Sequence, residues 1–356
     1  MSHFSPTSPD ISVLMYAHDA EKTLRRAVES IQNQPAKNVE IVVVDDGSAD
    51  GTPRMLDVMS ERDIRVVVIH EQGVGRARCL GRALEAAHGS YLMVMDADGW
   101  LERDVLSAML DRVENDGLEL LVGGFALELV MAGHSVELLA ESQACDFASQ
   151  ADFRSNAWQL FASGQLGPAS AKLFSRQAAE DFGAQFGDDK YSDHVFVQSF
   201  LRDVERVGVM GGVQYRVERE VRAEDFDISA DAPIAALDRE YEAAQELLCH
   251  WGLDGDTPSS QMLQSRYVEL LTLCAEAAFG SVFKLSSTER NAAVAKMVST
   301  KRAQLAAVGA QPRNGAARAF AGSIRAGNVP MACAQARLWS LLHRGVPTNL
   351  MPDIYL

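Results

Sequence analysis

The stretch VEIVVVDDGS, residues 39–48, decides the fold. Its four central apolar residues, 41–44, do not alternate with polar ones, so both faces of a strand here are expected to be covered. A strand buried on both faces is typical of a parallel sheet that carries helices on either side. The strand then runs into Asp45 and Asp46, followed by a Gly-Ser turn. The stretch therefore predicts a buried parallel strand that ends in chemically active groups.

The segments around this stretch alternate between strand and helix patterns. Short apolar runs predict further strands, and apolar residues at helical spacing predict the helices between them. The predicted strands are 11–15, 39–48, 64–69 and 91–95. The predicted helices are 21–34, 52–59 and 75–89. We therefore predict an α/β fold with a mostly parallel, Rossmann-like sheet and helices on both faces.

Polar side chains follow three of these strands, at the point where each strand ends. They are Asp45-Asp46, His70-Glu71, and Asp96 with Asp98. Ligands of parallel sheets bind beyond the carboxyl ends of the strands, so these groups are expected to meet at one edge.

The pair Asp96 and Asp98, in YLMVMDADGW (91–100), has two interpretations. It is either a polar turn closed by Asp98-Gly99, or a site where two carboxylates bind one divalent cation. Like charges this close need a compensating partner. A cation would also let an acidic chain bind a diphosphate, with Arg76 and Arg78 facing the phosphates from a helix N-terminus.

The second half of the chain has a different sequence pattern, with mixed strands and helices followed by helices alone. Between 118 and 220 we predict two strands around Gly133-His134, helices at 150–163 and 192–205, and two short strands within 208–220. Residues 235–345 are rich in Ala, Leu, Glu and Gln with helical periodicity. The predicted units are a catalytic domain at 1–230 and a helical C-terminal region at 231–356.

Composition narrows the class of protein. The chain has 356 residues and a net charge of −16, which argues against general nucleic-acid binding. The five scattered cysteines are expected to be reduced, buried thiols. Neither a signal peptide nor a stretch of about 18 apolar residues is visible, so we expect a cytoplasmic protein, peripheral at most to the inner membrane face.

The motifs together resemble those of family-2 glycosyltransferases, which have the nucleotide-sugar-binding GT-A fold. The resemblance rests on four motifs in order: ISVLMYAHDAEKTL, VEIVVVDDGSADGT, EQGVGRARCLGRAL and YLMVMDADG. It covers residues 10–105 closely and extends more loosely to about 220, where the chain looks like bacterial polysaccharide-type members. Nothing familiar covers the helical C-terminus.

The resemblance implies roles for particular residues. Asp46, with Asp45 as the second choice, matches the carboxylate that contacts uracil, and Asp19 and Arg78 lie beside the nucleotide. Asp96 matches a ribose and metal contact, and Asp98 the direct ligand of Mn²⁺ or Mg²⁺. Asp193 matches the catalytic base of inverting members.

The residues around Asp193 leave two interpretations open. Asp193 precedes an apolar stripe at the start of a helix, where a carboxylate is favoured and could act as a base. The same position suits a plain helix N-cap.

The chain departs from the family pattern at four places. Tyr16 stands where the family often has Pro, Cys79 where it has Asn, Gly99 where it has a third Asp, and Ser192 where it has Glu.

Three further residues are open to two interpretations each. Lys172 is either a diphosphate or acceptor contact or a surface lysine whose charge reaches water. Trp100 either stacks on an acceptor sugar or closes the cleft. His194 either contacts phosphate or metal, or is an ordinary polar histidine.

The resemblance thus implies an inverting, metal-dependent glycosyltransferase of the hexosyltransferase type. It would move a sugar from a UDP-sugar to a glycan or lipid-linked acceptor in cell-surface polysaccharide synthesis. The alternative is a weakened glycosyltransferase-like module that binds a partner or a nucleotide sugar without turnover. The C-terminal helices would form a homodimer, dock on a membrane surface or cover the acceptor site.

Overall fold

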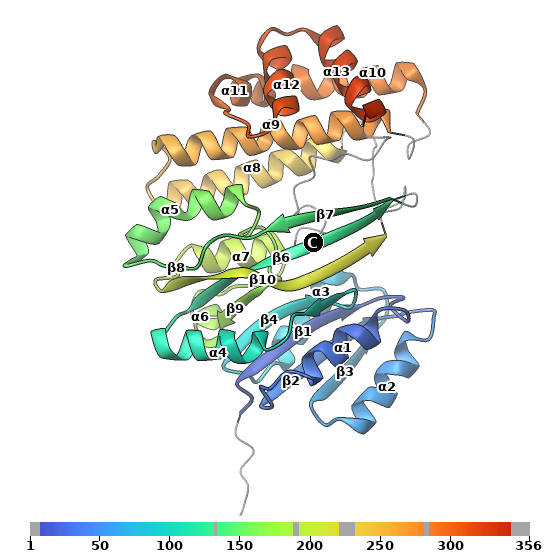
Figure 1. The fold of residues 1–356 in the computed structure, drawn as a ribbon, viewed down its shortest axis with the longest axis vertical. Coiled ribbons are helices and arrows are strands. Elements are labelled where there is room, and N and C mark those ends of the chain that lie inside the picture. Colours follow the sequence, from blue (N-terminus) through green and yellow to red (C-terminus); the bar gives the residue numbers. More distant parts are fainter. Residues whose placement is uncertain (1–7, 132–133, 188–191, 221–231, 281–284, 343–356) are drawn as a thin grey trace, which may run out of the picture.

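The computed structural model describes residues 8–131, 134–187, 192–220, 232–280 and 285–342. Ten strands form one sheet (Figure 1). They are β1 (Ile11–Ala17), β2 (Val39–Asp46), β3 (Val66–Glu71), β4 (Tyr91–Asp96), β5 (Gly99–Leu101), β6 (Leu120–Met131), β7 (His134–Ala140), β8 (Cys145–Asp146), β9 (Lys172–Ser175) and β10 (Val207–Glu220). The main order is β3-β2-β1-β4-β9-β6-β10-β5, with β7 beside β6 and β8 beside β10.

The N-terminal half of the sheet is parallel, as the sequence predicts. β1 lies between β2 and β4, and β3 pairs with β2, all in parallel register. The carboxyl ends of these four strands therefore meet at one edge. β2 is buried over its whole length, which confirms the prediction made from its unbroken apolar run.

The other half of the sheet is mixed. β9 runs antiparallel to both β4 and β6, whereas β6 and β10 are parallel to each other. The prediction of two short strands within 208–220 is wrong, because a single long strand, β10, spans this segment. Its register against β6 shifts between Val209 and Tyr215, and Gly212 in between has a φ of 79°. The two adjacent glycines thus mark a bulge and not a turn.

Helices cover both faces of the sheet. The helices of the first 205 residues are α1 (Leu24–Gln32), α2 (Thr52–Arg62), α3 (Arg76–Ala86), α4 (Val105–Asp116), α5 (Gln150–Ala162), α6 (Arg176–Asp181) and α7 (Ser192–Leu201). One core packs α1, α2 and α4 against the sheet, and a second core packs α3, α5 and α7 against the opposite face. The helices α4 and α6 are additions that the sequence analysis did not predict.

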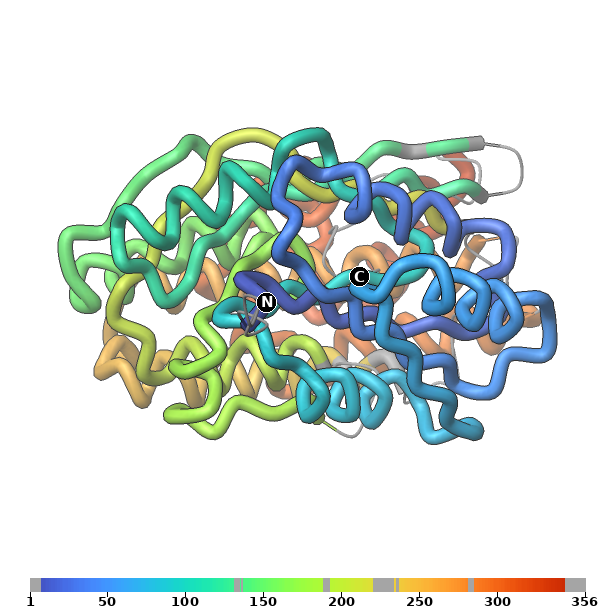
Figure 2. Tube along the Cα trace, turned by 90° about the horizontal axis from the view of Figure 1, so that it is seen from below, coloured from blue at the N-terminus to red at the C-terminus, as the bar shows by residue number. Residues whose placement is uncertain are grey.

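The C-terminal helices form a third core of their own. They are α8 (Ala232–His250), α9 (Thr257–Phe279), α10 (Ser287–Ser299), α11 (Lys301–Gly309), α12 (Gly315–Arg325) and α13 (Val329–Leu342). Leu247 of α8, Leu263 of α9 and Trp251, which follows α8, also enter the core around α5 and α7. Figure 2, seen from below, shows the N-terminal segments in front and these helices behind them.

Two expectations drawn from composition can be compared with the structure. Among the described residues, no helix is both long enough and apolar enough to span a membrane. All five cysteines are free thiols, but the prediction that they are buried is wrong for most of them. Cys79 is buried, whereas Cys145 and Cys249 are exposed and the other two are partly exposed.

Candidate active site

The candidate site lies on the α3 side of the sheet, at the carboxyl edge of its parallel half. Alternate residues of β1, β2 and β4 point into the core beneath α3, and each series ends in a polar residue: Tyr16, Asp46 and Asp96. Tyr16 is directly opposite Asp96 in the register of β1 and β4. Asp46 and Asp96 are each 5% exposed. Three neighbouring strands thus deliver two buried carboxylates and a phenol to one place.

Arg76, the first residue of α3, binds two carboxylates from distant segments. Its Nη2 lies 2.7 Å from Oδ1 of Asp96, and its Nη1 and Nη2 donate to both carboxylate oxygens of Asp193. Asp193 is 2% exposed and lies in the first turn of α7. Burial opposes the charge of Arg76, but Asp193 and Asp96 raise its pKa well above the ordinary value. The guanidinium therefore joins the end of β4 to the start of α7.

Arg219, near the end of β10, binds the two carboxylates of the Asp-x-Asp motif. Its Nε lies 2.9 Å from Oδ2 of Asp98, and its Nη2 lies 3.2 Å from Oδ1 of Asp98 and 3.4 Å from Oδ2 of Asp96. Burial alone would raise the pKa of Asp96, but Arg76 and Arg219 hold it below the ordinary value of 3.8. Both carboxylates therefore converge on a single cationic group.

The pairing of β5 with β10 explains why Arg219 reaches the motif. Gly99 is opposite Val217 in this antiparallel ladder, so Asp98 lies next to the position of Arg219. Tyr215 packs beneath the motif, and its hydroxyl accepts a hydrogen bond from the amide of Asp96 at 3.1 Å. A Cβ on Gly99 would lie 2.0 Å from that hydroxyl oxygen. The glycine found where the family often has a third Asp thus makes room for Tyr215.

Asp46 is held by a glycine-containing loop. Its two carboxylate oxygens accept hydrogen bonds from the amides of Val74 (2.6 Å) and Gly75 (2.9 Å). Gly75 has a φ of 88°, which glycine adopts without strain. Burial, with the Asp46 carboxylate second, raises the pKa of the Cys79 thiol to about 12, so this thiol keeps its proton beside Asp46. Cys79 can therefore donate a hydrogen bond in place of the family's Asn.

Tyr16 fills the space between the two carboxylates of this edge. Burial raises the pKa of its phenol to about 12, and the negative charges of Asp46 and Asp96 add to the increase. The phenol is therefore neutral at physiological pH and is available as a hydrogen-bond donor.

Asp45 and Asp19 lie apart from this cluster, around the turn that follows β2. Asp45 accepts hydrogen bonds from the hydroxyl of Ser48 at 2.5 Å and from His70 at 3.1 Å. Asp19, whose φ is 46°, accepts from the amide of Ala49 at 2.7 Å, and its own amide donates to Ser48. Of the two neighbouring aspartates, Asp46 is the one that shares a face with Asp96.

Two basic residues of the predicted site lie in different surroundings. Arg78 is exposed and forms no ion pair with the part of the chain that the structure describes. Lys172 is fully buried, and its ammonium donates to the backbone carbonyls of Pro168 and Ser170. The alternative interpretation of Lys172 as a surface lysine is therefore wrong.

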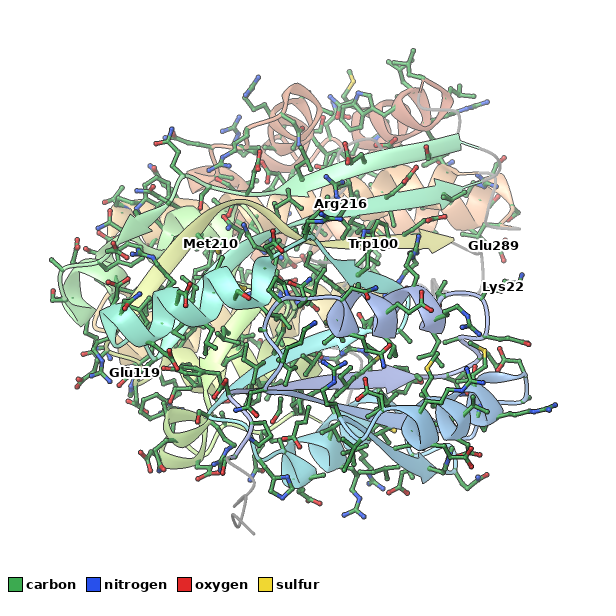
Figure 3. The ribbon with its side chains drawn as sticks, turned by 60° about the horizontal axis from the view of Figure 1, so that its bottom comes forward. Lys22, Trp100, Glu119, Met210, Arg216 and Glu289 are labelled. Atoms are coloured by element: carbon green, nitrogen blue, oxygen red, sulfur yellow. The ribbon has the colours of Figure 1, made fainter. Side chains whose placement is uncertain are left out.

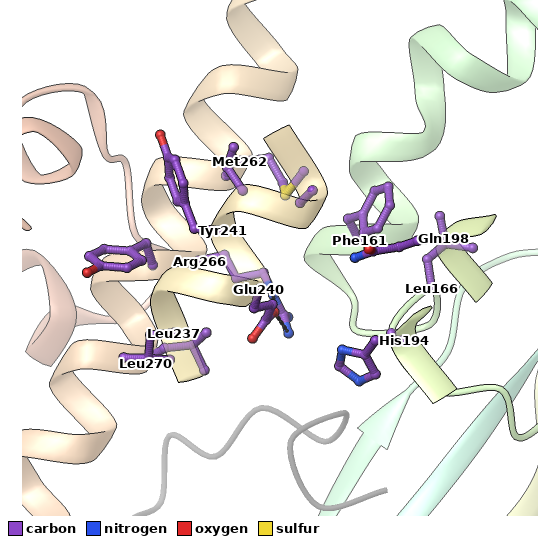
Figure 4. A pocket seen from close by; sticks show the side chains of 14 residues that line it. Phe161, Leu166, His194, Gln198, Leu237, Glu240, Tyr241, Met262, Arg266 and Leu270 are labelled. Atoms are coloured by element: carbon purple, nitrogen blue, oxygen red, sulfur yellow. Dashed lines mark hydrogen bonds and ion pairs between the residues drawn. The ribbon is translucent and has the colours of Figure 1, made fainter. Parts of the chain in front are cut away.

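Trp100 and His194 face other surroundings. Trp100 is opposite Arg216 on β10 (Figure 3), and the guanidinium of Arg26 lies 3.9 Å from the centre of its ring. Because side chains alternate along β10, Arg216 and Trp100 point away from the face of Arg219. His194 lines a cavity between α5 and α7 on one side and α8 and α9 on the other (Figure 4).

Asp96 and Asp98 could bind a divalent cation if a substrate supplied further ligands. Among the described residues, no group of three or more His, Cys, Asp or Glu side chains could hold a metal ion. Asp96 and Asp98 nevertheless converge on one cationic group, the guanidinium of Arg219. Mg²⁺ and Mn²⁺ commonly take one or two carboxylates and complete their shell with water and substrate phosphates. The donor set therefore suits a cation that arrives with a diphosphate.

Known proteins resemble the N-terminal half of the chain. The model of glycosyl transferase family 2 matches residues 12–178, a segment that includes Asp46, Arg76, Asp96 and Asp98. This segment of the chain is therefore similar to family-2 glycosyltransferases.

Two individual relatives are similar to about a third of the chain. The putative glycosyltransferase EpsH of Bacillus subtilis is 34% identical over 119 residues, which are 33% of this chain and 34% of EpsH. The succinoglycan biosynthesis protein ExoO of Rhizobium meliloti is 34% identical over 115 residues, 32% of each chain. These alignments thus span about a third of either relative.

Solved structures confirm the predicted GT-A fold. S. aureus TarS 1–349 in complex with UDP-GlcNAc has a TM-score of 0.60 at 15% identity, covering 93% of this chain and 92% of TarS 1–349. Residues 1–230 alone could not supply so large a share of the chain. The likeness in fold therefore includes most of the C-terminal helices, for which the sequence showed no resemblance.

Replacing Arg76 by Ala should lower the free energy of unfolding by about 3 kcal/mol at pH 7, because two buried carboxylates lose their partner. In the native chain the pKa of Asp96 is lower than its ordinary value of 3.8, and this difference stabilises the folded state. The stabilisation is fully present at pH values above 3.8 and is lost as the pH falls through the lowered pKa of the folded state. Without Arg76, burial pushes this pKa upward, so the loss should be larger at pH 8 than at pH 5.

Chemical denaturation of both proteins at the two pH values measures this difference. Arg82→Ala is the matched control, because Arg82 lies on the same helix but pairs with Glu71 and Glu85 at the surface. It should change stability little at either pH. A loss for Arg76→Ala that does not depend on pH would contradict the role given to its charge.

Proposed function

We propose that this chain is an inverting glycosyltransferase that transfers a sugar from a UDP-sugar to a hydroxyl group of a glycan or lipid-linked acceptor. One observation carries the proposal: Asp96, Asp98 and Asp193, from separate segments, are joined through Arg76 and Arg219 at the edge where α/β sheets bind ligands. The match of residues 12–178 to glycosyl transferase family 2 supports sugar transfer as the reaction at this cluster.

Asp193 is proposed as the base. It would accept the proton of the acceptor hydroxyl while that oxygen attacks the anomeric carbon and the diphosphate leaves from the opposite side. A single displacement of this kind inverts the configuration at the anomeric carbon. Arg76, bound to both oxygens of Asp193, would fix the orientation of the carboxylate.

The donor side is proposed to form around the remaining residues. Asp98 and Asp96 would hold Mn²⁺ or Mg²⁺, which stabilises the charge of the departing diphosphate when bound. Asp46 would meet the base of the nucleotide, and Asp19, Asp45 and Arg78 would lie along its outer side. The TarS complex contains UDP-GlcNAc, and this supports a UDP-sugar as the donor class.

The biological setting is proposed to be the synthesis of a cell-surface polysaccharide. ExoO is a succinoglycan biosynthesis protein, and its 34% identity to this chain over 115 residues supports such a setting. A homodimer through the C-terminal helices and a domain boundary near residue 230 stay predictions, as do the acceptor roles of Trp100, Lys172 and His194.

Incubation of the chain with a panel of UDP-sugars should give UDP release that requires Mn²⁺ or Mg²⁺. Asp98→Ala should lower this rate at least about a hundredfold, because the proposed metal loses its direct ligand. Nucleotide-sugar binding without turnover, even with acceptors supplied, would instead support a binding module.

The two carboxylates at opposite ends of the site should respond differently to substitution. Asp193→Asn should reduce transfer by about a thousandfold or more, with UDP affinity within a few-fold of the native value, because a base acts on the acceptor. Asp46→Ala should weaken UDP binding about tenfold through the loss of one hydrogen bond to the base. Calorimetry with UDP measures both affinities, and lost UDP binding in Asp193→Asn would contradict its role.

A further inference from the structure

Arg219 occupies the position in which the Asp-x-Asp motif would hold a cation. Its guanidinium donates to both oxygens of Asp98 and to one oxygen of Asp96, at 2.9 to 3.4 Å. A divalent ion bound by the same oxygens would have to displace at least part of this guanidinium. The two cations therefore compete for one set of ligands.

The charges of the cluster reinforce this competition. Three carboxylates, Asp96, Asp98 and Asp193, face two guanidinium groups, those of Arg76 and Arg219. The guanidinium of Arg219 and a divalent ion are both positively charged, so they cannot occupy the same oxygens of Asp98 and Asp96 together. The positive charge of Arg219 therefore opposes a metal ion at these oxygens until the guanidinium moves away or an anion accompanies the ion.

Arg219 is the arginine that can withdraw. Arg76 is fixed at the start of α3 and is bound to two carboxylates that are nearly completely buried. Arg219 lies one residue from the end of β10, its side chain is 30% exposed, and Asp98, to which it is bound, is 25% exposed. Movement of the Arg219 side chain would leave the Arg76 bridge between β4 and α7 intact.

We infer that Arg219 and the divalent ion replace one another on Asp98 and Asp96, and that the displaced guanidinium binds the diphosphate of the donor. This inference rests on the proposed function, since it assigns the exchange to the nucleotide-sugar site. A guanidinium leaving Asp98 stays next to the metal and is suited to phosphate oxygens. Arg219 would thus oppose the metal ion alone and favour the metal ion together with a diphosphate.

The test compares Mn²⁺ binding by the full chain and two variants, measured from the electron paramagnetic resonance of free Mn²⁺ without nucleotide. Arg219→Gln should bind Mn²⁺ about tenfold more tightly than the native chain, because a competing positive charge is gone. Arg216→Gln is the matched control, since Arg216 lies on the same strand but pairs with Glu102 and Glu137 on the other face. Equal or weaker Mn²⁺ binding by Arg219→Gln would overturn the competition.

The second arm measures UDP binding by calorimetry at saturating Mn²⁺. Arg219→Gln should bind UDP about tenfold more weakly than the native chain, opposite in sign to its effect on Mn²⁺. Unchanged or tighter UDP binding would overturn the diphosphate contact. If none of the proteins binds UDP, the proposed function fails, while the Mn²⁺ arm still tests the competition.

A third variant guards against misfolding of Arg219→Gln. Arg219→Lys keeps the positive charge, so its Mn²⁺ affinity should stay within about threefold of the native value. The Nε–H resonance of Arg219, assigned by its absence in Arg219→Lys, should shift when Mg²⁺ and UDP are added to the native chain. A resonance that does not move on saturation would overturn the exchange.

Discussion

The bridge from Asp96 through Arg76 to Asp193 is the interaction on which the rest of the site depends. Asp96 ends a central strand, Arg76 begins the helix packed over it, and Asp193 begins a helix more than a hundred residues later. Breaking such a pair leaves buried charge without compensation, so the three segments are held together electrostatically as well as by packing. Arg219 extends the bridge to Asp98, and with it the acidic groups become one cluster.

The parallel half of the fold could be predicted because its physical cause is local. The unbroken apolar run of β2 and the helical spacing around Leu24, Leu56 and Leu80 require no knowledge of distant partners. The single strand β10 is not predictable in this way, because Gly211 and Gly212 suit a turn as well as a bulge, and the pairing with β6 decides between them. The third core could not be predicted from the sequence for the same reason, since its assembly depends on contacts between whole helices.

The carboxylates of the site could be predicted, but their partners could not. Strand ends and the family motifs point to Asp46, Asp96, Asp98 and Asp193, and the structure connects the last three through two arginines. The sequence places Arg76 at a helix start, where it can face phosphates, whereas Arg219 lies in no recognisable motif and reaches Asp98 through the β5–β10 ladder. The burial of Lys172 and the stacking of Trp100 on Arg26 likewise depend on neighbours distant in sequence.

The central claim is that acidic side chains from separate segments surround one divalent ion at the edge of the sheet. The most direct test is the anomalous difference density of Mn²⁺ in a crystal of the chain with Mn²⁺ and UDP. The account predicts one strong peak about 2.0–2.2 Å from a carboxylate oxygen of Asp98, with the Arg219 guanidinium moved from that oxygen to the diphosphate. A peak elsewhere, or UDP bound with the Arg219–Asp98 ion pair unchanged, would contradict it.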